Sequence, residues 1–245
     1  MNNRGIRYKT SSTWALVILS LAIVMGCEVK PPVEEGKFKK SELIELIRLD
    51  PSFKLDIRYA TSNNFVGKPV YTEARAFLQR PAAQALVKVN QKLKESGFGL
   101  IIFDGYRPWS VTKTFWDITP EEDKKFVANP KNGSRHNRGC AVDLTLYKIS
   151  TGKQVEMTGK YDEMSERSYP DYKGGTEEQR QMRDLLRKTM EEHGFSVYEY
   201  EWWHFDYKYW KSYRIENIPF SEIGRKPNKK SQAMLQSFPQ ACLEQ

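Results

Sequence analysis

The spacing of apolar residues predicts two long helices in this chain. Over residues 81–96 apolar side chains recur on one helical face, and Gly97 follows as a stop. A second helix begins at Thr176, which has Gln179 at the spacing of an N-terminal capping box. Two shorter stretches are also expected to be helical: residues 108–117 and 120–128.

Alternation with a period of two predicts strands elsewhere. Residues 140–147 alternate cleanly, with Asp143 on the polar face and a row of apolar residues on the other. A short apolar run predicts a buried strand over residues 100–103. Strands are also expected in two longer segments: residues 43–59, which Asp50 and Pro51 divide, and the aromatic-rich residues 195–209.

These elements occur in separate clusters, without a regular alternation of strand, helix and strand. Polar loops separate them, the longest over residues 129–139 and 150–175. The pattern predicts an α+β domain with a mostly antiparallel central sheet that is flanked by helices.

The N-terminus has the pattern of a lipoprotein signal peptide over residues 1–26. Three basic residues precede an apolar run over residues 14–26, which has the length of a signal-peptide core. Gly26 directly before Cys27 resembles a bacterial lipobox, so we expect Cys27 to be lipidated. An ordinary signal peptide and a short uncleaved anchor are the alternatives.

Composition divides the rest of the chain into three parts. Residues 27–39 contain two prolines and several charges and predict an extended tether, residues 40–220 form the folded domain, and residues 221–245 form a basic tail. This order predicts an exported lipoprotein that is anchored in a membrane and faces the periplasm or the cell exterior. An oxidising compartment would allow Cys140 and Cys242 to pair, which sequence does not decide.

Composition excludes several classes of protein. Aromatic residues make up 13% of the chain, too many for a wholly disordered protein, and three cysteines are too few for a disulfide-stapled scaffold. No apolar run reaches the roughly 20 residues of a membrane-spanning helix. The net charge of +8 falls to about +5 without residues 1–26, and the dispersed basic residues predict no nucleic-acid partner. No obligate protein partner is inferred.

The chain has only three histidines, and two of them suit a metal site. His193 precedes a glycine at a predicted helix end, which indicates a structural role. His136 lies before the strand of Asp143, and Gly139 can bend the chain between them. A catalytic zinc site needs three protein ligands and one open position, and with His204 such a set is present.

A carboxylate near the open position would move protons between water and the leaving amine. Glu201, three residues before His204, is the candidate, and Glu199 is the alternative. Residues three apart in a regular strand face opposite sides, so either base requires a bulge or a turn. Each motif is weak alone, because a single histidine in an aromatic strand is more often simply packed.

Arg107 follows the buried strand predicted over residues 100–103. An arginine at this place could stabilise the oxyanion of a tetrahedral intermediate. The alternative is a surface ion pair. The conjunction of this arginine with two histidines and an acidic residue favours a catalytic site.

Together the motifs resemble the zinc D,D-peptidases that act on peptidoglycan precursors, and most closely the VanX-type D-alanyl-D-alanine dipeptidases. The metal motif is a Ser-x-His-x-x-Gly-x-Ala-x-Asp frame from Ser134 to Asp143, followed by Glu201-x-x-His204. Further matching segments span most of residues 43–210: residues 55–61, 64–67, 103–108, 162–168 and 201–205.

The resemblance implies a hedgehog-like zinc D,D-peptidase fold with one Zn²⁺ per chain. It implies that His136, Asp143 and His204 hold the metal. It further implies that Glu201, rather than Glu199, is the general base and acid, and that Arg107 stabilises the transition state.

The resemblance also implies a substrate and two side chains that contact it, Ser134 and Asp162. The expected reaction is hydrolysis of the dipeptide D-alanyl-D-alanine to D-alanine in the cell envelope, and Asp162 suits the dipeptide's free ammonium group. A D,D-carboxypeptidase that trims peptidoglycan stem peptides is the first alternative. The second is a non-catalytic lipoprotein that binds the wall through an aromatic cleft of Tyr106, Trp109, Trp202 and Trp203.

Overall fold

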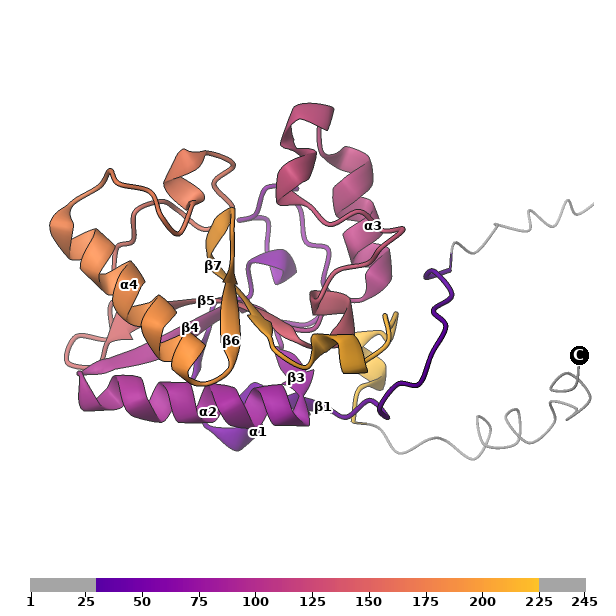
Figure 1. Cartoon of the computed structure of the whole chain (residues 1–245), viewed down its shortest axis with the longest axis horizontal. Coiled ribbons are helices and arrows are strands. Elements are labelled where there is room, and N and C mark those ends of the chain that lie inside the picture. Colours follow the sequence, from indigo (N-terminus) through magenta and orange to yellow (C-terminus); the bar gives the residue numbers. More distant parts are fainter. Residues whose placement is uncertain (1–29, 225–245) are drawn as a thin grey trace, which may run out of the picture.

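A five-stranded sheet organises the protein in a computed structural model, which describes residues 30–224 (Figure 1). The strand order is β2-β4-β5-β7-β6, and only the β2–β4 pair is parallel. The strands are β2 (Lys54–Leu55), β4 (Phe98–Asp104), β5 (Ala141–Lys148), β6 (Phe195–Tyr198) and β7 (Glu201–Tyr207). The predicted α+β fold with a mostly antiparallel sheet is confirmed.

Two long helices cover one face of this sheet (Figure 1). α2 (Arg80–Glu95) packs against β4, and α4 (Glu177–Glu192) packs against β6. The capping box at the start of α4 is present as predicted. Apolar side chains of β5 face these helices and belong to the main core: Val142, Leu144 and Leu146.

The opposite face of the sheet carries the polar residues of β5. A small apolar cluster on this face consists of Ile101, Phe103 and Tyr147, with Tyr161 packed against it. α3 (Trp109–Ile118) lies on this side, well away from α2 (Figure 1). The main core therefore leaves this face free to form a site.

Some predicted elements differ from the observed ones. Residues 43–59 were expected to be strands, but α1 (Leu46–Leu49) is a helical turn between β1 (Leu43–Glu45) and β2. Leu46 is fully buried and α1 packs against α2, so tertiary packing decides its conformation. β1 pairs with a strand that the pattern did not indicate, β3 (Phe77–Gln79).

Several short segments form 3₁₀ turns rather than loops or α-helices. The helix expected over residues 120–128 is such a turn. The turns are η1 (Arg58–Ala60), η2 (Glu121–Phe126), η3 (His136–Arg138), η4 (Glu166–Ser168), η5 (Trp210–Ser212) and η6 (Phe220–Glu222). The predicted signal peptide, Cys27 and residues 225–245 lie outside the described residues. Within residues 30–224, no helix has the length and apolar character needed to cross a membrane.

Asp50 joins the segment after α1 to α2, and its removal is expected to destabilise the fold. Its carboxylate accepts hydrogen bonds from the Ser52 amide and hydroxyl (3.0 and 2.6 Å) and from Asn90 Nδ2 (2.8 Å). Burial raises the pKa of Asp50, but these bonds and Lys94 outweigh burial and lower it to about 2. Asp50→Ala should lower the free energy of unfolding at pH 7 by about 2 kcal/mol.

Urea denaturation at several pH values checks this expectation. The folded pKa of Asp50 lies below its ordinary value of 3.8, so its stabilisation is complete above that pH and disappears as pH falls toward 2. The difference between wild type and Asp50→Ala should shrink over this range. Asp171→Ala, whose side chain is 80% exposed, is the control and should change little. A pH-independent difference would show that the ionised carboxylate is not the cause.

Candidate active site

His136 lies in η3, and its surroundings fix which ring nitrogen is free. Nδ1 lies 2.7 Å from the Gly105 carbonyl oxygen, which can only accept, so Nδ1 donates and Nε2 keeps its lone pair. Gly139 then turns the chain into β5 with a φ of 64°, and a Cβ there would lie 2.5 Å from Leu43. The predicted bend at Gly139 is confirmed.

Asp143 and His204 lie directly opposite each other in the antiparallel register of β5 and β7. Cross-strand partners project from the same face of a sheet, so the two side chains are neighbours. His204 Nε2 donates to Asp206 at 3.0 Å, so Nδ1 is the ring nitrogen that faces Asp143. The sheet register therefore places a carboxylate beside an imidazole.

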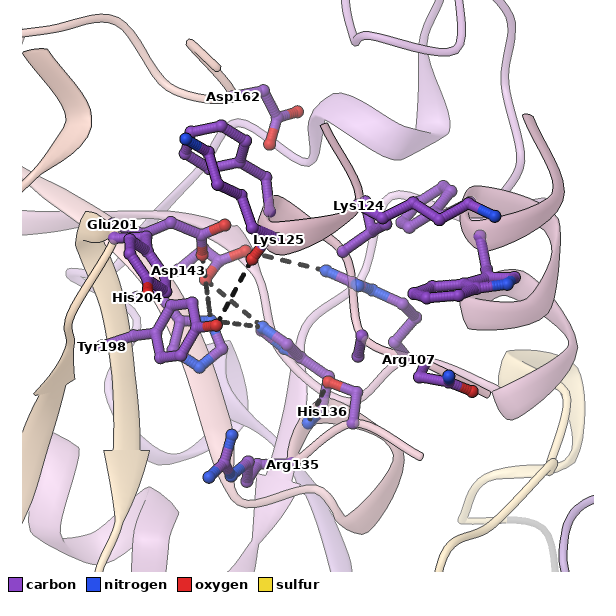
Figure 2. Close-up of a pocket in the computed structure, with 18 of the residues that line it drawn as sticks. Arg107, Lys124, Lys125, Arg135, His136, Asp143, Asp162, Tyr198, Glu201 and His204 are labelled. Atoms are coloured by element: carbon purple, nitrogen blue, oxygen red, sulfur yellow. Dashed lines mark hydrogen bonds and ion pairs between the residues drawn. The ribbon is translucent and has the colours of Figure 1, made fainter. Parts of the chain in front are cut away.

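These three side chains converge in a buried cluster that could hold a metal ion (Figure 2). His136 Nε2 lies 3.1 Å from His204 Nδ1 and 3.3 Å from Asp143 Oδ1, and the last two atoms are 3.1 Å apart. Tetrahedral ligands about 2.0–2.1 Å from Zn²⁺ are about 3.3 Å from one another. The spacing of the cluster thus fits zinc without rearrangement.

The charges of the cluster also favour a bound cation. Asp143 Oδ1 is buried and has no hydrogen-bond donor among residues 30–224, although two ring nitrogens face it. Burial lowers the pKa of His204, but the carboxylates of Asp206 and Asp143 outweigh burial and raise it to about 10. Two buried carboxylates thus favour a positive charge at His204, and a metal ion would supply that charge in place of the proton.

Glu201 reaches the same cluster because the β6–β7 hairpin is irregular. Val197 pairs with Phe205, whereas the next residue, Tyr198, pairs with Glu201, so residues 202–204 bulge out of register. Glu201 Oε2 consequently lies 3.6 Å from His204 Nδ1. The irregularity removes the objection that residues three apart in a strand face opposite sides.

Glu201 is also electrostatically suited to proton transfer. Burial and the nearby Asp143 carboxylate raise its pKa to about 8, although His204 opposes them. A carboxyl group with a pKa near neutrality can both accept and return a proton. The three-residue cluster and Glu201 line a cavity in the protein. The alternative base, Glu199, lies exposed in the hairpin turn and does not line this cavity.

Arg107 extends into the cavity beside the metal cluster (Figure 2). Its Nε and Nη2 donate to Asp104 Oδ2 at 3.0 and 2.8 Å, and Nη2 lies 3.8 Å from Asp143 Oδ2. The ion pair considered from sequence exists, but it is buried rather than at the surface. Asp104 therefore fixes the orientation of a charged group that faces the reaction site.

Tyr161 is a site residue that the sequence analysis missed. Its hydroxyl donates to Asp143 Oδ2 at 3.0 Å, and its ring stacks on Phe103 with centroids 4.4 Å apart. Tyr161 thereby leaves Asp143 Oδ1 free to face the two histidines. The available signal was its position directly before Asp162 in a matching motif, but the polarity of the surrounding loop concealed it.

Removing the Tyr161 hydroxyl should weaken metal binding. Tyr161→Phe keeps the stack on Phe103 but leaves Asp143 free to rotate, so we expect about a tenfold loss of zinc affinity in a chelator competition. Tyr147→Phe is the matched control, because that hydroxyl donates to the Ser52 carbonyl instead. Equal affinity of wild type and Tyr161→Phe would contradict this role.

Asp162 lines the same cavity, at a distance from the metal cluster (Figure 2). It has a positive φ of 60°, which is uncommon outside glycine. Tyr59 donates to its Oδ1 at 3.0 Å, while Oδ2 is buried and has no donor among residues 30–224. Burial and Asp143 raise the pKa of Asp162 to about 7. A cationic group that entered the cavity would satisfy this carboxylate.

The cavity has a volume of about 550 Å³, and all the predicted site residues of the catalytic domain line it. Ser134 lines it, and its hydroxyl accepts a bond from the His136 amide at 3.2 Å. The four aromatic residues that the wall-binding alternative requires do not form a cleft, contrary to that expectation. Tyr106, Trp109 and Trp202 are buried outside the cavity, and of those four aromatics only Trp203 lines it.

Two other residues have the structural roles that their surroundings dictate. His193 lies at the C-terminal end of α4, where its Nδ1 is 2.8 Å from the Thr189 carbonyl oxygen, as expected for a structural histidine. Cys140 is buried, and burial raises the pKa of its thiol to about 12. Its possible partner Cys242 lies outside the described residues.

The α+β fold, the two-histidine, one-carboxylate cluster and the adjacent glutamate define a metallopeptidase. The family model described as "D-ala-D-ala dipeptidase" matches residues 39–214, and the chain belongs to this peptidase M15 family of zinc enzymes. The D-alanyl-D-alanine dipeptidase of Escherichia coli K12 is 34% identical over 181 residues, which are 74% of this chain and 92% of the relative. That of Enterococcus faecalis is 38% identical over 168 residues, which are 61% and 83%.

Solved structures show weaker likeness. The LdcB LD-carboxypeptidase is 19% identical with a TM-score of 0.40, over 71% of each chain. The D,D-dipeptidase VanXYg is 20% identical with a TM-score of 0.36, over 58% of this chain and 52% of that one. These values are too low to add to the assignment, which rests on the family match and the relatives.

Proposed function

We propose that this protein is a zinc dipeptidase that hydrolyses D-alanyl-D-alanine to D-alanine, with the metal bound by His136, Asp143 and His204. The observation that carries the proposal is the buried, half-satisfied carboxylate of Asp162 in the cavity of the metal cluster. A free dipeptide presents an ammonium group near its scissile bond, and Asp162 is the acceptor for it. The names of the E. coli and enterococcal relatives support the same substrate.

Zinc, when bound, lowers the pKa of water and polarises the substrate carbonyl. Glu201 accepts a proton from the attacking water and returns it to the leaving amine. Arg107, held by Asp104, offers positive charge to the oxygen that becomes negative in the transition state. Asp162 orients the substrate through its ammonium group, and the Ser134 hydroxyl lies where it can contact the dipeptide.

A D,D-carboxypeptidase would use the same chemistry on a longer peptide. Its substrate carries an amide in place of the free ammonium, and an amide would leave the buried Asp162 without a cationic partner. The geometry around Asp162 therefore favours the dipeptidase. A non-catalytic wall-binding protein would need neither Glu201 nor Asp162 in the cavity.

Turnover of a substrate panel tests the proposal. D-Ala-D-Ala, L-Ala-L-Ala, N-acetyl-D-Ala-D-Ala and a stem pentapeptide are compared with and without added zinc. We expect D-alanine release from the free D,D-dipeptide, loss of release after chelation, and little cleavage of the acetylated form. Faster cleavage of the pentapeptide than of the dipeptide would favour the carboxypeptidase, and no turnover or bound metal would favour a binding protein.

We further propose that the protein acts outside the cytoplasm as a lipoprotein. The basic residues, the apolar run and the Gly26-Cys27 pair support cleavage before Cys27 and lipidation of that residue. Residues 40–220 are then the catalytic domain, and residues 27–39 connect it to the lipid. Mass spectrometry of the N-terminal peptide should show a lipid on Cys27, and Cys27→Ala should release the protein from the membrane fraction.

A further inference from the structure

Positive and aromatic side chains gather where the N-terminal segment meets the chain that follows β7. The Lys39 amide donates to the Ser212 carbonyl at 2.8 Å, so the two segments lie side by side. We define the basic-aromatic patch by seven residues of these segments: Phe38, Lys39, Lys208, Tyr209, Trp210, Lys211 and Arg214.

Contacts between cations and aromatic rings connect the two segments. The Arg214 guanidinium lies 4.6 Å from the centre of the Phe38 ring. Lys39 and Lys208 lie 5.4 and 5.1 Å from the centre of the Tyr209 ring, which is 49% exposed. The patch is therefore one surface rather than a scatter of separate side chains.

The positive charge of this patch is uncompensated. Its three lysines and Arg214 are all exposed, and none forms an ion pair with a carboxylate within residues 30–224. Elsewhere on the surface many cations are paired, as in Lys92–Glu95 and Arg187–Glu191. Unpaired cations beside the exposed ring of Tyr209 and the half-buried rings of Phe38 and Trp210 suit an anionic partner that also has an apolar layer.

The N-terminal segment holds the patch close to the proposed lipid. Glu34 bonds to Arg138 (2.5 Å) and accepts from the Ile215 amide (2.6 Å), so the segment is fixed to the domain from this residue onward. Cys27 lies seven residues earlier, a distance of at most about 25 Å in a fully extended chain. A lipid on Cys27 would keep this side of the domain near the bilayer.

We propose that the basic-aromatic patch is a membrane-docking surface that binds anionic phospholipid headgroups. The proposal rests on the lipoprotein assignment for its geometry, but the patch can be tested without the lipid. Lysine and arginine are attracted to anionic headgroups, and Tyr209 and Trp210 are residue types that favour the membrane interface. Trp210 also lines the catalytic cavity, so docking sets the orientation of that cavity relative to the bilayer.

Vesicle sedimentation with the zinc-loaded mature chain, residues 27–245 without lipid, tests this surface. We expect binding to phosphatidylcholine vesicles that contain phosphatidylglycerol, weaker binding at high salt, and little binding to phosphatidylcholine alone. The double variant Lys208→Gln/Lys211→Gln should lower the partition coefficient by about 25-fold, about fivefold for each cation. The matched control, Lys88→Gln/Lys188→Gln, removes the same charge from exposed, unpaired lysines of α2 and α4.

Several results would overturn the docking surface. These are no binding of the wild type to anionic vesicles, an equal loss in both double variants, or binding to an anionic wall polymer without binding to vesicles. Dipeptide hydrolysis is measured in parallel. The four lysines that the two double variants replace do not line the cavity, so the activity of both variants should equal that of the wild type. Normal vesicle binding without hydrolysis would instead contradict the proposed function, and the mass of the Cys27 peptide tests the anchor separately.

Discussion

Replacing Glu201 by glutamine should lower kcat for D-alanyl-D-alanine by about 10³-fold while zinc stays bound. Glutamine has nearly the same shape but cannot accept the proton of the attacking water. The three ligand atoms of the cluster belong to other residues, so the metal content should be unchanged. Steady-state kinetics and metal analysis of the same preparation measure both effects.

Glu199→Gln is the control for this substitution. Glu199 is two residues away and exposed in the hairpin turn, so the same chemical change there should leave kcat close to wild type. Loss of activity in Glu199→Gln together with normal activity in Glu201→Gln would reverse the assignment of the base. Loss of zinc in Glu201→Gln would instead show that this carboxylate is needed to hold the metal.

Substitution of His136 should remove both zinc and activity. His136→Ala leaves two ligands, and sites with fewer than three protein ligands hold zinc weakly, so we expect no bound zinc after dialysis and no measurable hydrolysis. The ring is buried and bonded to Gly105, so His136→Gln serves as a second variant that fills more of the space. Circular dichroism confirms that each variant is folded.

His193→Ala is the matched control, because His193 is the one histidine of the chain outside the cluster. It should keep one zinc per chain and normal turnover, with some loss of stability from the broken contact to Thr189. Full zinc occupancy and activity in both His136 variants would contradict the ligand assignment. Loss of zinc in His193→Ala would do the same, since that residue lies at a helix end.

Much of the fold follows from local pattern. The helices α2 and α4 were predictable because a 3.6-residue period, a capping box and terminal glycines agree with one another. β5 was predictable because its two faces differ in polarity. α1 and β3 are three or four residues long, and such short segments carry no period, so contacts with distant parts of the chain determine them.

The site was only partly predictable for a related reason. Histidine is rare in this chain, which drew attention to His136 and His204. The resemblance to D,D-peptidases then selected Asp143 and Glu201 among the many carboxylates. Tyr161 contributes to the site through a hydrogen bond to Asp143, a residue 18 positions earlier in the chain. Nothing in the sequence of its polar loop indicates this contact. Asp206, the hydrogen-bond partner of His204 Nε2, was likewise not identified, although residues two apart in a strand project from the same face and this spacing was an available signal.

The irregular hairpin means that the metal ligand and the general base are positioned by different neighbours. His204 takes its place from β5, through its pairing with Asp143, whereas Glu201 takes its place from Tyr198 at the hairpin turn. A one-residue deletion within residues 202–203 would preserve one of these alignments but not both. If His204 kept its pairing with Asp143, the shortened protein would retain the three metal ligands while Glu201 lost its place beside them, so chain length in this hairpin separates metal retention from hydrolysis.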